Sequence, residues 1–151
     1  MKLTWRPRAG QSGSALVLGD DALGFRSAGS KFILSAGPTA VQFLSEAVAY
    51  PRAEEIATFG RGNAQTSYAA LIDYQFATVG ACSQFLHRIG TDLDGAGVLE
   101  VTHDGGGQDS MEAICTAIQR VQRDGAMLVL SYTFLGGLFT KGPASNLVPI
   151  T

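Results

Sequence analysis

The residues that could take part in catalysis are few, and the most suggestive pair is His103 followed directly by Asp104. A histidine oriented by a carboxylate can act as a general base, and the glycines at 105–107 would supply a flexible lid. Adjacent residues of a strand point to opposite faces, however, so His103 and Asp104 are not expected to hydrogen-bond as a dyad. The pattern favours a histidine and an aspartate at the edge of a turn.

The other chemically interesting residues do not have the spacing of a catalytic or metal site. His87 falls on the polar side of a predicted helix and is expected to be solvated. Cys82 and Cys115 belong to no CxxC pair, so we interpret them as reduced, buried thiols, with a disulfide as the less favoured alternative. The segment 60–62, Gly-Arg-Gly, lacks the GxGxxG and Gly-Lys-Ser/Thr patterns of phosphate-binding loops. We therefore expect no enzyme activity, no cofactor and no metal.

Length and composition indicate one globular domain spanning residues 1–151. Apolar residues make up 46% of the chain and charged residues only 16%, below the roughly 25% of an average protein. The net charge is −2 and the basic residues are not clustered, which argues against specific nucleic-acid binding. No apolar run approaches the ~18 residues of a membrane span, and the N-terminus lacks the apolar core of a signal peptide. We expect the protein to be synthesised in the cytoplasm and not to associate with a membrane.

The first half of the chain is predicted to contain short strands and one helix. Residues 1–31 are loop-rich, with a short strand at 16–18, and a second strand is expected at 31–35. From residue 39 the apolar residues follow the spacing i, i+3, i+4, i+7 and i+8, which predicts a helix over 39–49 that ends before Pro51. The glycine-rich segment 60–63 is interpreted as a turn.

The middle of the chain gives clearer patterns. Residues 66–78 carry aromatic and aliphatic side chains at every second position, which predicts a strand with one packed face. Residues 79–89 fit a helix with one apolar stripe, which Gly90 should end. A short strand is expected at 98–102. The stripe of that helix consists of Val79, Cys82, Leu86 and Ile89.

The C-terminal segment supports two interpretations. Residues 114–121 match a helical stripe, but Asp124-Gly125 is a strong hairpin signal and residues 126–139 are rich in strand-forming residues. A two-residue Asp-Gly turn gives the hairpin one apolar and one more polar face, so we favour a long hairpin over 111–139. The pairs expected in this register are Arg123 with Ala126, Val121 with Leu128, Ala117 with Tyr132, and Cys115 with Phe134.

These patterns define two sets of candidate residues. The predicted core contains Tyr74, Phe76, Leu86, Leu128, Tyr132 and Phe134. The more polar face of the hairpin is the candidate assembly interface, and it contains Arg120, Gln122, Met127, Val129, Ser131 and Thr133.

Residues 60–139 contain a characteristic order of short motifs: Arg61-Gly62-Asn63, an aromatic strand ending near Thr78, a short helix, Gly97-Val98-Leu99, and Ser131-Tyr132-Thr133-Phe134 leading into Gly136-Gly137. In this order the segment resembles small tail-structural proteins of tailed bacteriophages. The resemblance implies an α+β, mostly β fold: a β-sandwich or partly closed barrel with one or two flanking helices and a long C-terminal hairpin.

The resemblance also implies a function. We expect a structural protein of a phage or phage-like tail, such as a tail tube, terminator or tail-tip component, located in the virion and in the host cytoplasm during assembly. Its partners would be further copies of itself, in a ring or tube, and other tail proteins. The alternatives are a ligand-binding or adaptor barrel and, less favoured, a small enzyme using His103. In the ligand-binding alternative the cavity would be lined by Trp5, Tyr68, Tyr74, Phe76, Tyr132 and Phe134.

Overall fold

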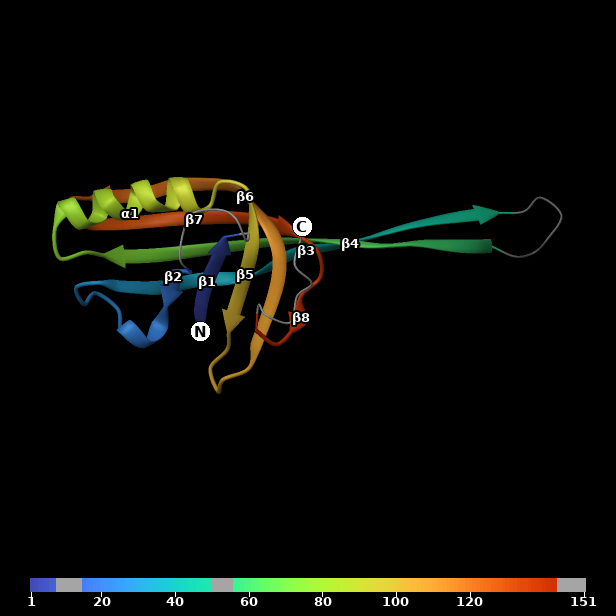
Figure 1. Ribbon diagram of the computed structural model, residues 1–151, viewed down its shortest axis with the longest axis horizontal. Coiled ribbons are helices and arrows are strands. Elements are labelled where there is room, and N and C mark those ends of the chain that lie inside the picture. The colour runs from blue at the N-terminus through green and yellow to red at the C-terminus, as the bar shows by residue number, and fades with distance from the viewer. Residues whose placement is uncertain (8–14, 50–55, 144–151) are drawn as a thin grey trace.

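A computed structural model describes residues 1–7, 15–49 and 56–143, with side chains described outside 44–63 (Figure 1). The described part consists of strands, one α-helix and one short 3-10 helix. Their bounds are β1 Lys2–Pro7, β2 Leu16–Asp20, η1 Asp21–Leu23, β3 Ser30–Ala49, β4 Ile56–Gln75, α1 Val79–Asp92, β5 Ala96–Thr102, β6 Gln108–Asp124, β7 Met127–Gly136 and β8 Thr140–Lys141.

The strands form one antiparallel sheet in the order β5-β1-β2-β3-β4-β7-β6-β8. The first strand in this order, β5, also pairs with β6, so the sheet curls round into a barrel. Closure is partial, because β2 and β3 pair only at Asp20 and Lys31. This architecture confirms the predicted fold class as its barrel form, with a single flanking α-helix.

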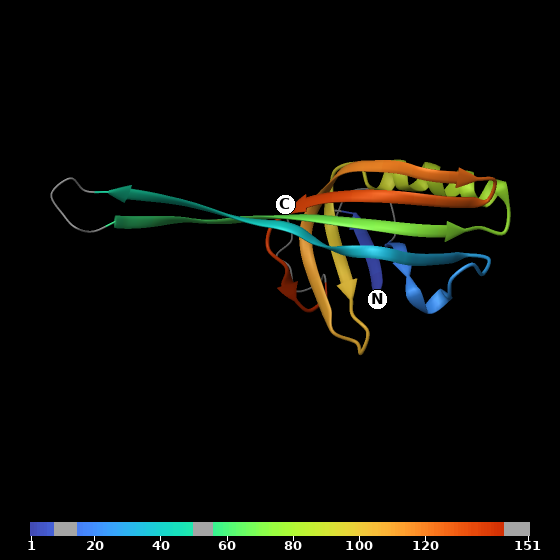
Figure 2. The same cartoon turned by 180° about the vertical axis from the view of Figure 1, so that it is seen from behind.

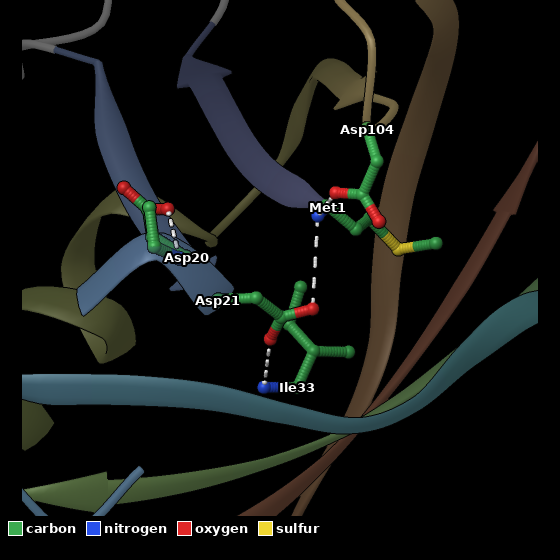
Figure 3. Close-up of polar contacts among 6 residues, drawn as sticks. Met1, Asp20, Asp21, Ile33 and Asp104 are labelled. Carbon is green, nitrogen blue, oxygen red and sulfur yellow. Dashed lines mark hydrogen bonds and ion pairs between the residues drawn. The ribbon is translucent and has the colours of Figure 1, made fainter. Parts of the chain in front are cut away.

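The seam between β2 and β3 is bridged by side chains where the strands do not pair. The Lys31 Nζ donates to the Val17 carbonyl over 3.1 Å. The Ile33 backbone N–H donates to the Asp21 carboxylate over 2.9 Å (Figure 3). Buried backbone polar groups need such partners, so these contacts let the barrel remain open here without leaving those groups unsatisfied.

The barrel interior is filled by aromatic side chains. Trp5, Tyr74, Tyr132 and Phe134 are all fully buried. The Phe134 ring lies 5.5 Å from Trp5 and 6.1 Å from Tyr132, between ring centroids. The Tyr74 hydroxyl donates to the Leu18 carbonyl at 2.6 Å and lies 2.6 Å from the Tyr132 hydroxyl. Most of the aromatic residues considered as a cavity lining therefore pack against one another.

The predicted helix is confirmed, but it is longer than expected and its buried stripe differs in part. It continues through Gly90 to Asp92, so the glycine does not end it. Phe85 is buried in the core, whereas Leu86 is partly buried. Val79 is 54% exposed. The buried stripe therefore keeps Cys82 and Ile89 of the prediction and contains Phe85 between them.

The prediction of a helix over 39–49 is wrong, because this segment is the outer half of β3. The strand β3 pairs with β4 along its whole length, from Ser30 with Gln75 to Ala49 with Ile56, with three shifts of register on the way. The expected turn at 60–63 is also wrong: it lies within β4, where the register shifts at Arg61 and Gly62. Helical spacing of apolar residues is overridden here by pairing with a strand distant in sequence.

The outer parts of β3 and β4 form a two-stranded arm, defined as residues 40–49 and 56–65. The strand β7 pairs with β4 only from Thr66 to Gln75. On the N-terminal side of Thr66, β4 pairs with β3 alone among the described strands. This two-stranded part projects away from the body, as both views show (Figures 1 and 2).

The long C-terminal hairpin is confirmed, with its turn one residue later than predicted. Asp124 pairs with Met127, so the connecting residues are Gly125 and Ala126. Gly125 has φ 58, a conformation that glycine adopts without a steric penalty.

The predicted register of this hairpin holds at one end only. Cys115 pairs with Phe134 as expected, but Ala117 pairs with Thr133 and Leu128 pairs with Arg123. The reason is two bulges in β6, at Thr116 and Val121. The later turn displaces the pairing near it from the predicted register by two residues. Each bulge shifts the pairing back by one residue, so the predicted register is restored beyond the second bulge.

Candidate assembly surfaces

Four neighbouring strands, β3-β4-β7-β6, form the part of the sheet that has free edges. Within the described part of the chain, β3 from Leu34 to Ala49 pairs only with β4. On the far side, β6 from Cys115 to Asp124 pairs only with β7. An edge strand presents a row of unpaired backbone N–H and C=O groups that can pair with another chain. The two free edges are therefore candidate sites for strand pairing.

The arm is a second candidate surface, because it is apolar and no other element among the described residues covers it. Phe43 is 71% exposed and Val41 is 44% exposed. Across residues 40–49 and 56–65 the only charged residues are Glu46 and Arg61. An isolated two-stranded ribbon is at best marginally stable in water, so a stable arm requires contacts beyond those that the described residues make with it.

A groove on the outer face of the four-stranded sheet is the third candidate. It encloses about 390 Å³ beside the loop at 24–29 and the β6–β7 turn. Several of its apolar side chains are well exposed: Phe25 at 49%, Leu34 at 45% and Val121 at 60%. The lining residues are Phe25, Arg26, Leu34, Leu71, Asp73, Val121, Gln122, Asp124, Met127, Leu128 and Val129.

One side of the groove is fixed by Arg26. Its backbone has φ 65, an uncommon conformation for a residue other than glycine. Its guanidinium lies over the Phe25 ring at 4.8 Å, forms an ion pair with the buried Asp73 at 3.6 Å, and donates to the Met127 Sδ at 3.8 Å. A buried carboxylate needs a partner, so the Asp73 pair explains why this backbone conformation is held.

The structure distributes the candidate interface residues over both sides of the hairpin. Arg120 pairs with the buried Leu130 and therefore lies on the helix side of the sheet rather than the outer face. The others share the outer face. Gln122, Met127 and Val129 line the groove, and Ser131 and Thr133 lie further along β7. The contribution of Phe25 and Arg26 was missed, because a short exposed loop carries no motif.

The candidate core residues lie in or beside the barrel interior. Tyr74, Leu128, Tyr132 and Phe134 are at most 1% exposed, while Phe76 and Leu86 are partly buried and pack against the core.

The histidine considered for catalysis has a different partner from the one weighed in the sequence. The His103 Nε2 lies 2.7 Å from the Asp109 Oδ2 across the β5–β6 turn, and both side chains are partly exposed. Asp104 instead pairs with the α-amino group of Met1. Within the described residues, no group of three or more potential ligands is placed to hold a metal ion.

The α-amino group of Met1 is held between two carboxylates (Figure 3). It hydrogen-bonds to Asp104 and lies 3.7 Å from the Asp21 Oδ2. The hydrogen bond to Asp104 raises the pKa of the amine, and the same bond lowers the pKa of the Asp104 carboxyl. These contacts tie the start of β1 to the β5–β6 turn and to η1.

The chain matches no known protein family, and no curated protein matches it. None of the described helices is long and apolar enough to cross a membrane. The fold and surfaces define a partly closed antiparallel barrel with two free sheet edges and a projecting apolar arm.

Proposed function

We propose that this protein is a structural component of a phage or phage-like tail, and that it acts by associating with further copies of itself. The observation that carries the proposal is the four-stranded sheet β3-β4-β7-β6, which has a free edge on each side. Strand addition at a sheet edge is a common mode of protein association, since main-chain hydrogen bonds supply the contact.

The two free edges favour a ring over a two-fold dimer. The β3 edge of one copy can pair with the β6 edge of the next. The growing chain of copies then still has one free β3 edge and one free β6 edge at its two ends. Such head-to-tail contacts close into rings when the rotation between copies allows it. Every copy in a closed ring has both edges paired.

Charge and resemblance support the same proposal. The net charge of −2 and the 16% of charged residues give little electrostatic repulsion between copies. The segment that resembles phage tail proteins, 60–139, contains β6, β7, most of β4 and the helix. Other tail proteins would be the remaining partners, in the virion and, during assembly, in the host cytoplasm.

The proposal is tested by light-scattering mass across a concentration series together with negative-stain electron microscopy. We expect rings or tubes whose abundance rises with concentration. A strict monomer at high concentration would contradict self-association.

A variant pair links the assembly to the sheet edge. Ala117→Lys with Gln119→Lys places two exposed lysines on the free part of β6, where lysine discourages pairing. Gln84→Lys with His87→Lys adds two lysines to the exposed side of α1 as the control. The β6 variant should lose rings while the helix variant keeps them; equal behaviour of the two would exclude the β6 edge as the contact.

A further inference from the structure

We propose that the groove is the seat for the arm of another copy, so that copies stack head to tail along the direction of the arm. This inference rests on the proposed self-association and names the axial contact, which edge pairing within a ring does not supply.

The positions of the two surfaces require a second copy. The β6–β7 turn and the loop at 24–29, which border the groove, lie at the end of the body opposite to the arm (Figures 1 and 2). The arm of one copy therefore points away from its own groove. Each molecule carries one arm and one groove, at opposite ends of its long axis.

The two surfaces also match in chemistry. The arm presents exposed Phe43 and Val41, and the groove presents exposed Phe25, Leu34 and Val121. The arm is long enough for the contact, because ten residues of extended strand span about 33 Å. Burying apolar side chains on both partners would provide the covering that neither surface has within the described chain.

The arrangement dictates how the assembly grows. Arm and groove are different surfaces, so the contact is head to tail, and with its partners at opposite ends it extends as a stack. The groove is also continuous with the proposed ring contact, because Leu34 and Val121 lie on the two strands with free edges. An arm seated there would lie beside the junctions between neighbours.

Photo-cross-linking of the full chain tests the seat directly. Benzoylphenylalanine replaces Phe25 in the groove and, as the control, Leu23, which is similarly exposed at 47% but does not line the groove. After irradiation of assembled protein, peptide mapping should place the partner of position 25 within residues 40–65 of another copy. Cross-links between copies that join position 25 to any segment other than 40–65, or equal arm cross-links from position 23, would overturn the proposal.

Charge substitutions test the same contact from both sides. Phe25→Glu and Phe43→Glu should each reduce the fraction of stacked rings at least tenfold while single rings persist, and Leu23→Glu should leave stacking unchanged. Phe43→Glu guards against loss of folding, because Phe43 lies outside the body and is 71% exposed.

The outcomes for the wild-type protein separate the two proposals. Single rings that never stack would overturn the arm seat and leave ring formation intact. A strict monomer would overturn both. Stacks that survive both glutamate substitutions would show that the axial contact lies elsewhere.

Discussion

The buried hydroxyl pair of Tyr74 and Tyr132 should respond unequally to removal of either oxygen. The Leu18 carbonyl can only accept, so the Tyr74 hydroxyl hydrogen points towards it over 2.6 Å. The Tyr132 hydroxyl, 2.6 Å from that of Tyr74, must then donate to the Tyr74 oxygen. Both side chains are 0% exposed, so water does not replace a lost partner.

The magnitudes follow from which groups lose their partners. Tyr132→Phe removes one hydrogen bond and leaves the bond from Tyr74 to Leu18 in place, at a cost of about 1 kcal/mol. Tyr74→Phe leaves both the Leu18 carbonyl and the Tyr132 hydroxyl unsatisfied, at about 1–3 kcal/mol each, or roughly 2–6 kcal/mol together. The double variant leaves only the Leu18 carbonyl unsatisfied, so its loss should be smaller than the sum of the single losses.

Equilibrium urea unfolding followed by Trp5 fluorescence measures these differences, since Trp5 is the only tryptophan and is fully buried. The expected order of loss is Tyr74→Phe greater than Tyr132→Phe, with a sub-additive double variant. An equal or larger loss for Tyr132→Phe, or strict additivity, would refute the assigned direction of the hydrogen bonds. Edge-strand variants that block assembly provide a monomeric background for the comparison.

Three further predictions follow from the packing and the pKa shifts. Gly136→Ala should unfold the protein or destabilise it by several kcal/mol, because its Cβ would overlap a backbone carbonyl of β6, whereas Gly137→Ala has open space and should be neutral by urea unfolding. Burial raises the pKa of Tyr68 from 10.0 to about 12. The contribution of the neutral Tyr68 side chain to the free energy of unfolding is therefore complete below pH 10 and falls by roughly 3 kcal/mol as the pH rises through 12. Between about pH 9 and pH 11, urea unfolding should show a smaller loss of stability in Tyr68→Phe than in the wild type. Asp104→Asn should lower the raised pKa of the Met1 amine, which an NMR titration detects. In the wild type, the ion pair of Met1 and Asp104 stabilises the fold between pH 3.8 and pH 8.0. The amine's contribution is lost as the pH rises through the raised pKa of the amine, and the carboxylate's contribution is lost as the pH falls through the lowered pKa of Asp104.

The elements predicted correctly are those whose determinants are local in the sequence. Thr78 caps α1 by accepting from the Ala81 backbone N–H at 3.1 Å, and the apolar stripe follows directly. The sequence favours the C-terminal hairpin, because Asp124-Gly125 outweighs a helical stripe when a strand-forming segment follows. Its exact register is not accessible, because the bulges at Thr116 and Val121 are features of the pairing of β6 with β7, and no local pattern in the sequence encodes them.

The elements missed depend on contacts between distant residues. The segment 39–49 has helical spacing, but its partner strand decides its conformation, and the prediction of a turn at 60–63 concealed that partner. Pro38 gave a usable indication, since proline within a strand is confined to edges, and β3 is an edge strand. The groove depends on Arg26 reaching Asp73 over 3.6 Å from 47 residues away, which no spacing rule reveals.

The bulges also limit how strongly two copies can pair edge to edge. On β3 the register shifts on either side of 35–38, and on β6 on either side of 117–120. Outside the arm, each edge therefore offers a regular run of at most four residues, and short edge strands of this kind protect a protein against indiscriminate aggregation. A single such contact should be weak, and the arm contact, made by a marginal ribbon, should be weak as well. Both together tie each copy to several others, which raises the effective concentration at each remaining contact. Assembly should consequently be cooperative, with little dimer between monomer and tube, and weakening either contact should raise the critical concentration measured by light scattering.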